Sequence, residues 1–382
     1  MFIKLLTIMT TLAVKNLFHD KVRLSVTLTG IIFALVLIAV QFGLFLGFLE
    51  TSANIVTRSG VDLWVTAPGL PHVNGGSAQP ERRRYKILAV PGVAKAEPYL
   101  LSFANWKLPS GAKESVQVVG YDLESGLGGP DALIAGSADG LRGDDTVIID
   151  EHYRKKLGVT ALGQAAEING VRARVEGYTQ GMLSFTTAPY VFTSFKHAQK
   201  YMNLPRTQTI FIVVRLARGA DAQTVKRSIT AALPDCQVFT NAEMAWKTQS
   251  YWVFSTGAGI TTLMGAVLGL LVGMVVVAQT IYAATVDHLR EFGTLKAMGA
   301  ANRYIYRVIV EQAVLSASMG YAVAIVVALA VVHAARGGDA PILLPAPVAA
   351  GLFGLAALMC VAASVISIRK ATEIDPAMVF RV

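Results

Sequence analysis

LSVTLTGIIFALVLIAVQFGLFLGFL, residues 24–49, contains no charged side chain and is flanked by Arg23 and Glu50. A helix of about 20 apolar residues crosses the ~30 Å hydrocarbon layer of a bilayer, so this run predicts a membrane span. The whole chain shares the bias, because 53% of its 382 residues are hydrophobic and only 15% are charged. Soluble domains carry about a quarter charged residues. A wholly soluble protein is therefore excluded.

Three further apolar runs predict three more spans. One lies between Lys247 and Asp287, and the others cover residues 304–335 and 343–368. The run after Lys247 is longer than a crossing requires, so its first part, about residues 251–262, is predicted to project as a stalk. The expected fold class is a membrane protein with four transmembrane α-helices, long stalk helices, and an α+β extracytoplasmic domain inserted between helices one and two.

The distribution of Lys and Arg predicts the orientation of the spans, because positive loops stay in the cytoplasm. Basic residues gather before span one, between spans two and three, and after span four, whereas the loop between spans three and four has only Arg336. Both termini are therefore expected in the cytoplasm and the long insertion outside. The predicted parts are a cytoplasmic amphipathic helix (1–23), span one with its stalk (24–57), the extracytoplasmic domain (58–240), a stalk with span two (241–286), a cytoplasmic coupling helix (287–303), spans three and four, and a cytoplasmic tail (369–382).

The extracytoplasmic region alternates strand patterns with turns. Strands are predicted at residues 61–66, 115–120, 146–149, 171–177, 189–192 and 209–216. A stripe of apolar side chains predicts a helix over residues 221–233, and with a strand at 237–239 it forms a β-α-β unit. Residues 141–190 are interpreted as an inserted second lobe.

Charge in this region is nearly balanced, with 22 basic and 18 acidic side chains between residues 50 and 250. Arg82, Arg83 and Arg84 form a dense basic run and stand next to Tyr85. We interpret them as a solvated surface, because a nucleic-acid partner is not expected outside the membrane.

Common catalytic and ligand motifs are missing from the sequence. There is no G-x-x-x-x-G-K-[ST] phosphate loop, no H-E-x-x-H and no C-x-x-C. We therefore expect no catalytic, cofactor or metal site and no enzyme activity of the chain alone. Cys236 belongs to the outer region and Cys360 to span four, so the two are not expected to pair.

Span two carries Gly265, Gly269 and Gly273, a small-x-x-x-small spacing on one helix face. Such faces allow close approach of helices in lipid, and both contact within the chain and a dimer interface remain open. Polar residues in the spans are few, so ion or proton coupling has little support. Glu311 is expected to pair with Arg307, four residues earlier on the same face.

The predicted cytoplasmic loop reads DHLREFGTLKAMGAANRYIYR, residues 287–307. Helical spacing covers residues 290–298, and Gly299 is expected to end the helix. This short helix either caps the spans or fits a groove in a partner protein.

The segment REFGTLKAMGA (290–300) resembles the R-E-I-G-x-L-K-A-x-G-A signature of FtsX-type ABC transporter permeases, which include MacB and the lipoprotein-releasing permeases. The ending ATEIDPAMVFR (371–381) is similar to the closing pattern of that family. One span, a large outer domain and three further spans is the layout of the family, so the resemblance covers the whole chain. Residues 20–44 are most similar to the DevC-like permeases of glycolipid exporters, although Leu35 stands where those sequences often have an acidic residue.

The resemblance implies a mechanotransmission permease of the bacterial inner membrane. It implies a homodimer, a separate cytoplasmic ABC ATPase dimer that binds ATP and Mg²⁺, and an HlyD-type adaptor with an outer-membrane channel. A lipid-like or hydrophobic substrate would be exported. The ATPase-coupling residues would be Phe292, Leu295 and Met298 as apolar knobs, with Arg290, Glu291 and Lys296 as a polar rim. Alternatives are an FtsX-like regulator of a cell-wall hydrolase and a lipoprotein-releasing permease.

Overall fold

The structure is a computed structural model that describes residues 21–287, 294, 298–335, 338 and 341–372. The chain divides into two units, which we call the membrane unit (Met1–Gly47 and Ile260–Val382) and the outer unit (Phe48–Gly259). Each unit is described by itself in the following paragraphs.

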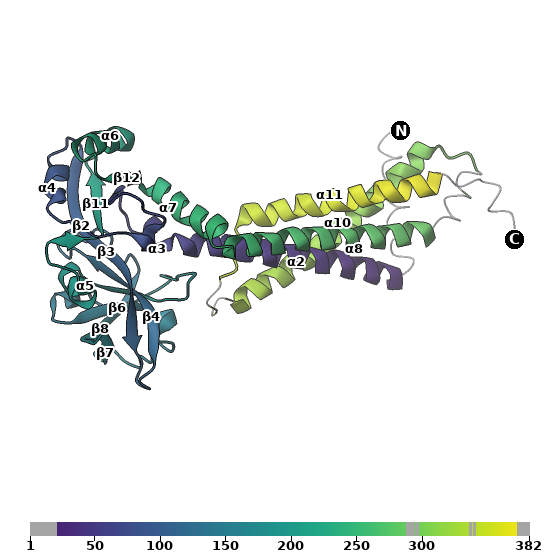
Figure 1. Cartoon of the computed structure of the whole chain (residues 1–382). Coiled ribbons are helices and arrows are strands. Elements are labelled where there is room, and N and C mark those ends of the chain that lie inside the picture. The colour runs from purple at the N-terminus through teal and green to yellow at the C-terminus, as the bar shows by residue number, and fades with distance from the viewer. Residues whose placement is uncertain (1–20, 288–293, 295–297, 336–337, 339–340, 373–382) are drawn as a thin grey trace. The chain divides into compact units, whose positions relative to one another are not determined.

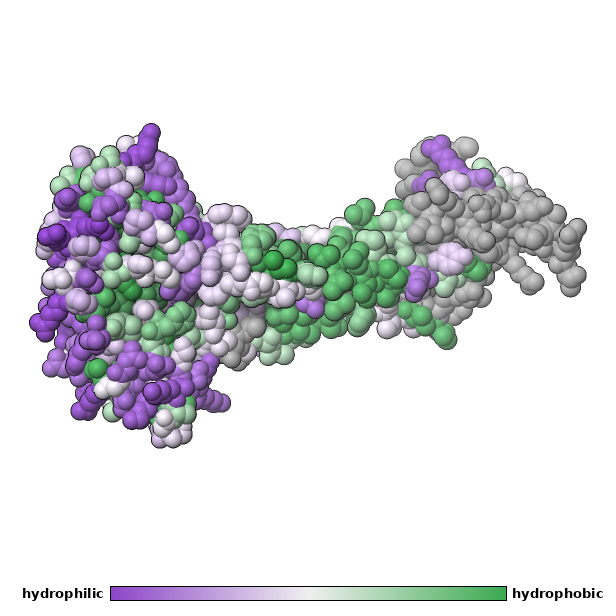
Figure 2. Space-filling view, viewed as in Figure 1, coloured by the Kyte–Doolittle hydropathy of each residue, from purple (hydrophilic) through white to green (hydrophobic). Residues whose placement is uncertain are grey.

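The membrane unit is built from four long helices, as predicted. They are α2 (Lys21–Ser52), α8 (Ala258–Asp287), α10 (Asn302–Ala334) and α11 (Ala346–Thr372). Among the described residues, four segments of these helices are long and apolar enough to cross a membrane. Their surfaces are largely hydrophobic in Figure 2, as lipid-facing surfaces must be.

Small side chains fill the interior of the membrane unit. The buried cluster contains eight alanines, which are Ala34, Ala39, Ala313, Ala317, Ala324, Ala328, Ala356 and Ala363. Small residues let helix backbones approach closely, which matters where lipid provides no hydrophobic drive for association. A polar contact also joins α10 to α11, since the hydroxyl of Tyr321 donates to the carbonyl oxygen of Ala349 at 2.9 Å. Arg307 and Glu311 pair at 3.0 Å, as expected from their spacing.

The predicted stalk over residues 251–262 is not one continuous helix. Helix α7 (Asn241–Ser250) passes into a π-helical turn (Tyr251–Ser255), and α8 begins after Gly257. Gly257 has a φ of +76°, a left-handed conformation that interrupts a right-handed helix and favours glycine. At the C-terminal end of α2, Ala53 separates this helix from the short α3 (Asn54–Thr57).

The outer unit contains one ten-stranded sheet in the order β12-β1-β11-β3-β4-β9-β6-β8-β5, with β7 paired to β3 and β8. The strands are β1 (Leu63–Thr66), β3 (Val93–Lys107), β4 (Lys113–Tyr121), β5 (Leu133–Gly136), β6 (Thr146–Asp150), β7 (Ala165–Ile168), β8 (Val171–Thr179), β9 (Tyr190–Ser194), β11 (Phe211–Leu216) and β12 (Gln237–Thr240). A separate pair is formed by β2 (Gln79–Pro80) and β10 (Gln208–Thr209). The other short helices are α4 (Arg83–Leu88), α5 (Phe195–Tyr201) and α6 (Ala222–Ala232), with 3₁₀ turns at Val73–Gly75, Ala138–Arg142 and Glu151–Tyr153.

The first lobe is formed by β12, β1, β11 and the first half of β3. Successive side chains of a strand point to opposite faces, and the buried clusters follow that alternation. Leu63 and Val65 of β1 pack with α4 and α6, whereas Trp64 belongs to the cluster on the other face. Strands β11 and β12 both run antiparallel to β1 and are joined through α6. The predicted β-α-β unit is confirmed, with β1 inserted between its two strands.

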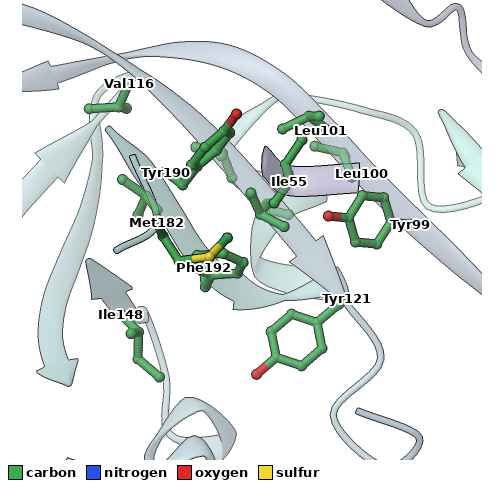
Figure 3. Packing of buried hydrophobic residues seen from close by; sticks show 14 of the residues in the cluster. Ile55, Tyr99, Leu100, Leu101, Val116, Tyr121, Ile148, Met182, Tyr190 and Phe192 are labelled. Carbon is green, nitrogen blue, oxygen red and sulfur yellow. The ribbon is translucent and has the colours of Figure 1, made fainter. Parts of the chain in front are cut away.

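The second lobe is larger than the predicted insertion of residues 141–190. It also uses β4, β9 and the second half of β3, whose residues 100–107 pair with β4. Its interior holds Tyr99, Tyr121, Tyr190 and Phe192, which Figure 3 shows packed with aliphatic side chains from several strands. The fifteen-residue β3 is common to both lobes, because its first half pairs with β11.

Replacing Trp64 by Ala is expected to destabilise the outer unit by about 3–5 kcal/mol, the usual cost of truncating a buried Trp. Trp64 is fully buried, its ring lies 5.3 Å from that of Tyr99, and its Nε1 donates to Asn241 Oδ1 at 3.0 Å. Hydrogen exchange of the β1 and β11 amides in the full chain measures the loss. Trp246 is 67% exposed, so Trp246→Ala is the control and should shift stability by less than ~0.5 kcal/mol. Equal protection in the two variants would contradict this account.

Candidate functional site: coupling turn, glycine face and aromatic junction

The predicted coupling helix is only partly described. The backbone N–H of Met298 donates to the carbonyl oxygen of Thr294 at 3.0 Å, and Gly299 follows with a φ of +92°. A helical turn therefore ends at Gly299, as the sequence predicts. Met298 is 71% exposed. The other predicted coupling residues, Arg290, Glu291, Phe292, Leu295 and Lys296, lie outside the described residues.

The three glycines of α8 face α2 within the same chain. A Cβ atom added at Gly265 would lie 3.2 Å from Gln41 Oε1, and one added at Gly273 would lie 3.1 Å from Ala34 Cβ. Gly269 faces Leu37 in the same way, at 3.5 Å. Of the two roles left open by the sequence, the structure shows the contact within the chain.

Gly43 and Gly47 of α2 contact the segment that connects α10 to α11. The N–H of Leu343 donates to the carbonyl oxygen of Gly43 at 3.0 Å. A side chain at Gly47 would collide with the carbonyl of Pro341. The first span therefore contacts α8 and the segment before α11, and at several of these contacts it has room only for a hydrogen atom.

Gly273→Leu is expected to lower the thermal midpoint of the full chain in detergent. The added side chain has no space against Ala34, so α2 and α8 must separate, and overpacking of this kind costs typically 1–3 kcal/mol. Gly354→Leu is the matched control, because a Cβ at Gly354 of α11 meets nothing within 4 Å. An equal midpoint for the two variants would refute the role of the glycine face.

Five rings meet within the outer unit, and we call this cluster the aromatic junction: Phe48, His72, Phe185, Tyr251 and Trp252. The ring of Phe185 lies 5.2 Å from Phe48 and 4.4 Å from Trp252, both edge-on. The imidazole of His72 lies 4.3 Å from Tyr251 and 4.9 Å from Trp252. Edge-to-face pairs add about 0.5–1.5 kcal/mol beyond area burial. The junction joins the end of α2, the π-helical turn, and two loops of the sheet.

Buried hydrogen bonds fix the loop that carries Phe185. Asn54 Nδ2 donates to the carbonyl oxygens of Gly181 and Leu183 at 3.1 and 3.0 Å. Gln117 Nε2 donates to Ser184 Oγ at 2.8 Å. Ser184 and Gln117 are both 1% exposed. Fully satisfied buried networks hold one geometry, so the position of Phe185 is tied to α3 and to β4.

Electrostatics at the junction favour a neutral His72. Burial lowers the pKa of its imidazole, and a side-chain hydrogen bond with Asn74 partly opposes this. The backbone N–H of Asn74 donates to Nδ1 at 3.3 Å, and only an unprotonated Nδ1 can accept this bond. A neutral ring is also compatible with stacking on Tyr251. His197, on α5, has its pKa lowered by burial as well.

Two arginines of the basic triplet form ion pairs in the outer unit and are only partly exposed, whereas Arg82 is exposed as the solvated-surface interpretation expects. Arg83 pairs with Asp235, and Arg84 pairs with Glu97 at 3.2 Å. Among the described residues no cluster of three His, Cys, Asp or Glu side chains is arranged for a metal ion. Cys236 and Cys360 are both free, as expected.

Lowering the pH from about 7.5 to 5 is expected to loosen the junction. A histidine with a lowered folded pKa binds its proton more weakly than in the unfolded chain. Its contribution is therefore complete above the unfolded value of about 6.5 and is lost as the pH falls toward the folded value. Amide exchange of residues 181–187, normalised to β6, measures the change. His72→Phe keeps a ring and removes the titration, so the same pH response in both proteins would contradict the assignment.

A membrane chain with an α/β domain inserted between the first two of four spans has the organisation of a permease subunit. Two family models match it: the MacB-like periplasmic core domain over residues 24–232 and the FtsX-like permease C-terminal domain over residues 247–376. The chain belongs to the FtsX/MacB-type family of ABC transporter permeases. It is therefore a multi-pass inner-membrane protein that works with a partner ATPase.

Known relatives are distant. An uncharacterized ABC transporter permease of Mycobacterium tuberculosis is 25% identical over 378 residues, which cover 96% of this chain and 98% of the relative. Its counterpart in strain H37Rv matches to the same extent. Similar solved structures include the periplasmic region of MacB from Actinobacillus actinomycetemcomitans (12% identity, 48% of this chain, 91% of that chain, TM-score 0.39). Another is the extracellular domain of the noncanonic ABC-type transporter YknZ from Gram-positive bacteria (13%, 47%, 98%, TM-score 0.36).

Sequence reasoning did not predict the aromatic junction. Phe185 and Trp252 are 67 positions apart, and Phe48 lies inside the apolar run of the first span. The one local signal is the pair Tyr251 and Trp252 at the start of the second apolar run, because aromatic residues gather at membrane interfaces.

Proposed function

We propose that this chain is the permease subunit of an ABC export system of the mechanotransmission class. A separate cytoplasmic ATPase dimer binds ATP and Mg²⁺, and its closure moves the spans, which pass the motion to the outer domain. The observation that carries this proposal is the aromatic junction. Phe48, where the chain enters the outer unit, and Trp252, where it leaves, both contact Phe185. A displacement of either segment therefore acts on one loop of the sheet.

The ATPase would contact the turn that ends at Gly299. Phe292, Leu295 and Met298 act as apolar knobs, and Arg290, Glu291 and Lys296 form the rim around them. The exposure of Met298 supports this role, since a large apolar side chain left in water gains free energy when a partner covers it. In this arrangement both termini lie in the cytoplasm.

The assembly we propose contains two copies of this chain, an HlyD-type adaptor and an outer-membrane channel. The homodimer is proposed, like the adaptor and the channel, from the resemblance to FtsX-type permeases. The exported substrate is lipid-like or hydrophobic, as the similarity of residues 20–44 to DevC-like permeases suggests. No nucleic acid takes part.

Leu295→Asp tests the contact with the ATPase. A carboxylate in an apolar interface pays a desolvation penalty that no partner charge offsets, so we expect co-purification of the native ATPase to fall at least about tenfold, which is ~1.4 kcal/mol. Undiminished association would reject the coupling assignment. Thr294→Asp, on the same turn but not among the knobs, is the matched control.

Phe185→Ala tests the transmission step in the same complex. The substitution removes both ring contacts and leaves the coupling turn intact, so the ATPase should still co-purify while substrate release in reconstituted vesicles is lost. Normal release would reject the junction as the transmission path. Activation of a cell-wall hydrolase without any transported substrate would favour the regulatory alternative over export.

A further inference from the structure

The loop that carries Phe185 is also held by the segment that follows β6, residues 150–156, which we call the loop support. Three of its side chains reach the loop, and they belong to Asp150, Tyr153 and Lys156. They are spaced three residues apart, and the segment begins with a 3₁₀ turn, in which residues three apart lie on the same side. The loop support therefore presents one row of side chains to the loop.

Asp150 joins the start of the loop to the 3₁₀ turn. It is 1% exposed. Its Oδ1 accepts a hydrogen bond from the backbone N–H of His152 at 3.1 Å. Its Oδ2 accepts one from the backbone N–H of Met182 at 2.8 Å and one from the hydroxyl of Thr179 at 3.0 Å. A buried carboxylate is costly unless such bonds satisfy it, so a displacement of Met182 is unfavourable.

Tyr153 holds the middle of the loop. Its side chain is fully buried. Its hydroxyl accepts a hydrogen bond from the backbone N–H of Ser184 at 3.2 Å and donates to the carbonyl oxygen of the same residue at 3.5 Å, because a phenolic hydroxyl is both donor and acceptor. These bonds fix the backbone directly before Phe185.

Lys156 holds the end of the loop. Its Nζ donates to the carbonyl oxygen of Thr187 at 2.6 Å and to Oγ1 of the same residue at 3.1 Å, and it pairs with Glu114 of β4 at 3.2 Å. Thr187 has a φ of +56°, a left-handed conformation that is unfavourable for a β-branched residue. Such a conformation persists only where surrounding contacts hold the backbone, and Lys156 provides two of them.

We propose that Asp150, Tyr153 and Lys156 are positioning residues that hold Phe185 where its ring contacts both Phe48 and Trp252. The loop support follows β6, which pairs with β8 and β9, so it also links the loop to the sheet of the second lobe. The role of these residues in transmission rests on the proposed function, whereas their effect on the position of the ring can be measured in the chain alone.

Hydrogen exchange of the full chain in nanodiscs tests the positioning role. Tyr153→Phe removes one hydroxyl, Lys156→Met removes one ammonium group, and Asp150→Asn replaces one acceptor oxygen by a donor. Each should raise the exchange of the amides of residues 182–187 at least about tenfold relative to β3, which is ~1.4 kcal/mol in opening of the loop. Lys155→Met is the matched control, because Lys155 is adjacent and exposed, and it should leave this exchange unchanged. Unchanged exchange in all three variants would overturn the proposal.

The position of the ring is measured separately through Trp252, whose indole lies 4.4 Å from the ring of Phe185. In the chain labelled with 5-fluorotryptophan, the ¹⁹F resonance of Trp252 is assigned from its loss in Trp252→Phe, and Phe185→Ala gives the resonance without the neighbouring ring. We expect all three variants to shift the Trp252 resonance toward that value. Trp246 is 67% exposed and its resonance should not move, which distinguishes a displaced ring from a general loss of structure. An unmoved Trp252 resonance in the three variants would overturn the proposal.

Adding ATP and Mg²⁺ to the complex with the native ATPase separates this inference from the proposed function. In the native chain, the exchange of the β6 amides should change, and each variant should abolish that change while the ATPase still co-purifies. No response in the native chain would reject the transmission path and leave the positioning result standing. A native-like response in all three variants would overturn the role of these residues in transmission.

Discussion

Close contact between the first two spans depends on glycines, which have no side chain to keep the helix backbones apart. Inside a bilayer, lipid is as apolar as leucine, so helices gain little by hiding apolar surface and must gain by close approach. Gly265, Gly269 and Gly273 provide that approach toward α2, and the buried alanines extend it to α10 and α11.

The outer unit follows the opposite rule. In water, burial of large apolar surface stabilises the fold, and the largest fully buried side chains of this unit are aromatic, with Trp64, Trp106 and Tyr99 at 1% exposure or less. The aromatic junction is built by the same rule at the point where the chain enters and leaves this unit. The loop that carries Phe185 is held by hydrogen bonds of Asn54 and Gln117, so polar and apolar contacts together define the position of that ring.

The membrane spans and several strands could be predicted from the sequence, because charged residues or turn residues bound their apolar runs. The spans are bounded by charges such as Arg23 and Asp287. Strands β1 and β11 are short apolar runs rich in β-branched and aromatic residues, which predict strands. The sequence of β3 does not predict a strand, because it contains Pro98 and several alanines. It forms a strand because the tertiary fold pairs it with β11 and β4. Gly257 and Gly265 illustrate the same limit: one interrupts a helix and the other packs within it, and residue type alone does not distinguish them. The junction escaped prediction because its rings meet only after folding.

Strand β3 gives the outer unit a particular mechanical character. Residues 93–99 pair with β11 and residues 100–107 pair with β4 through backbone hydrogen bonds. One continuous strand therefore belongs to both lobes. Sliding one lobe past the other would have to break the backbone N–H to C=O hydrogen bonds along that strand. The two lobes are therefore expected to move together, because β3 belongs to the hydrogen-bond ladders of both.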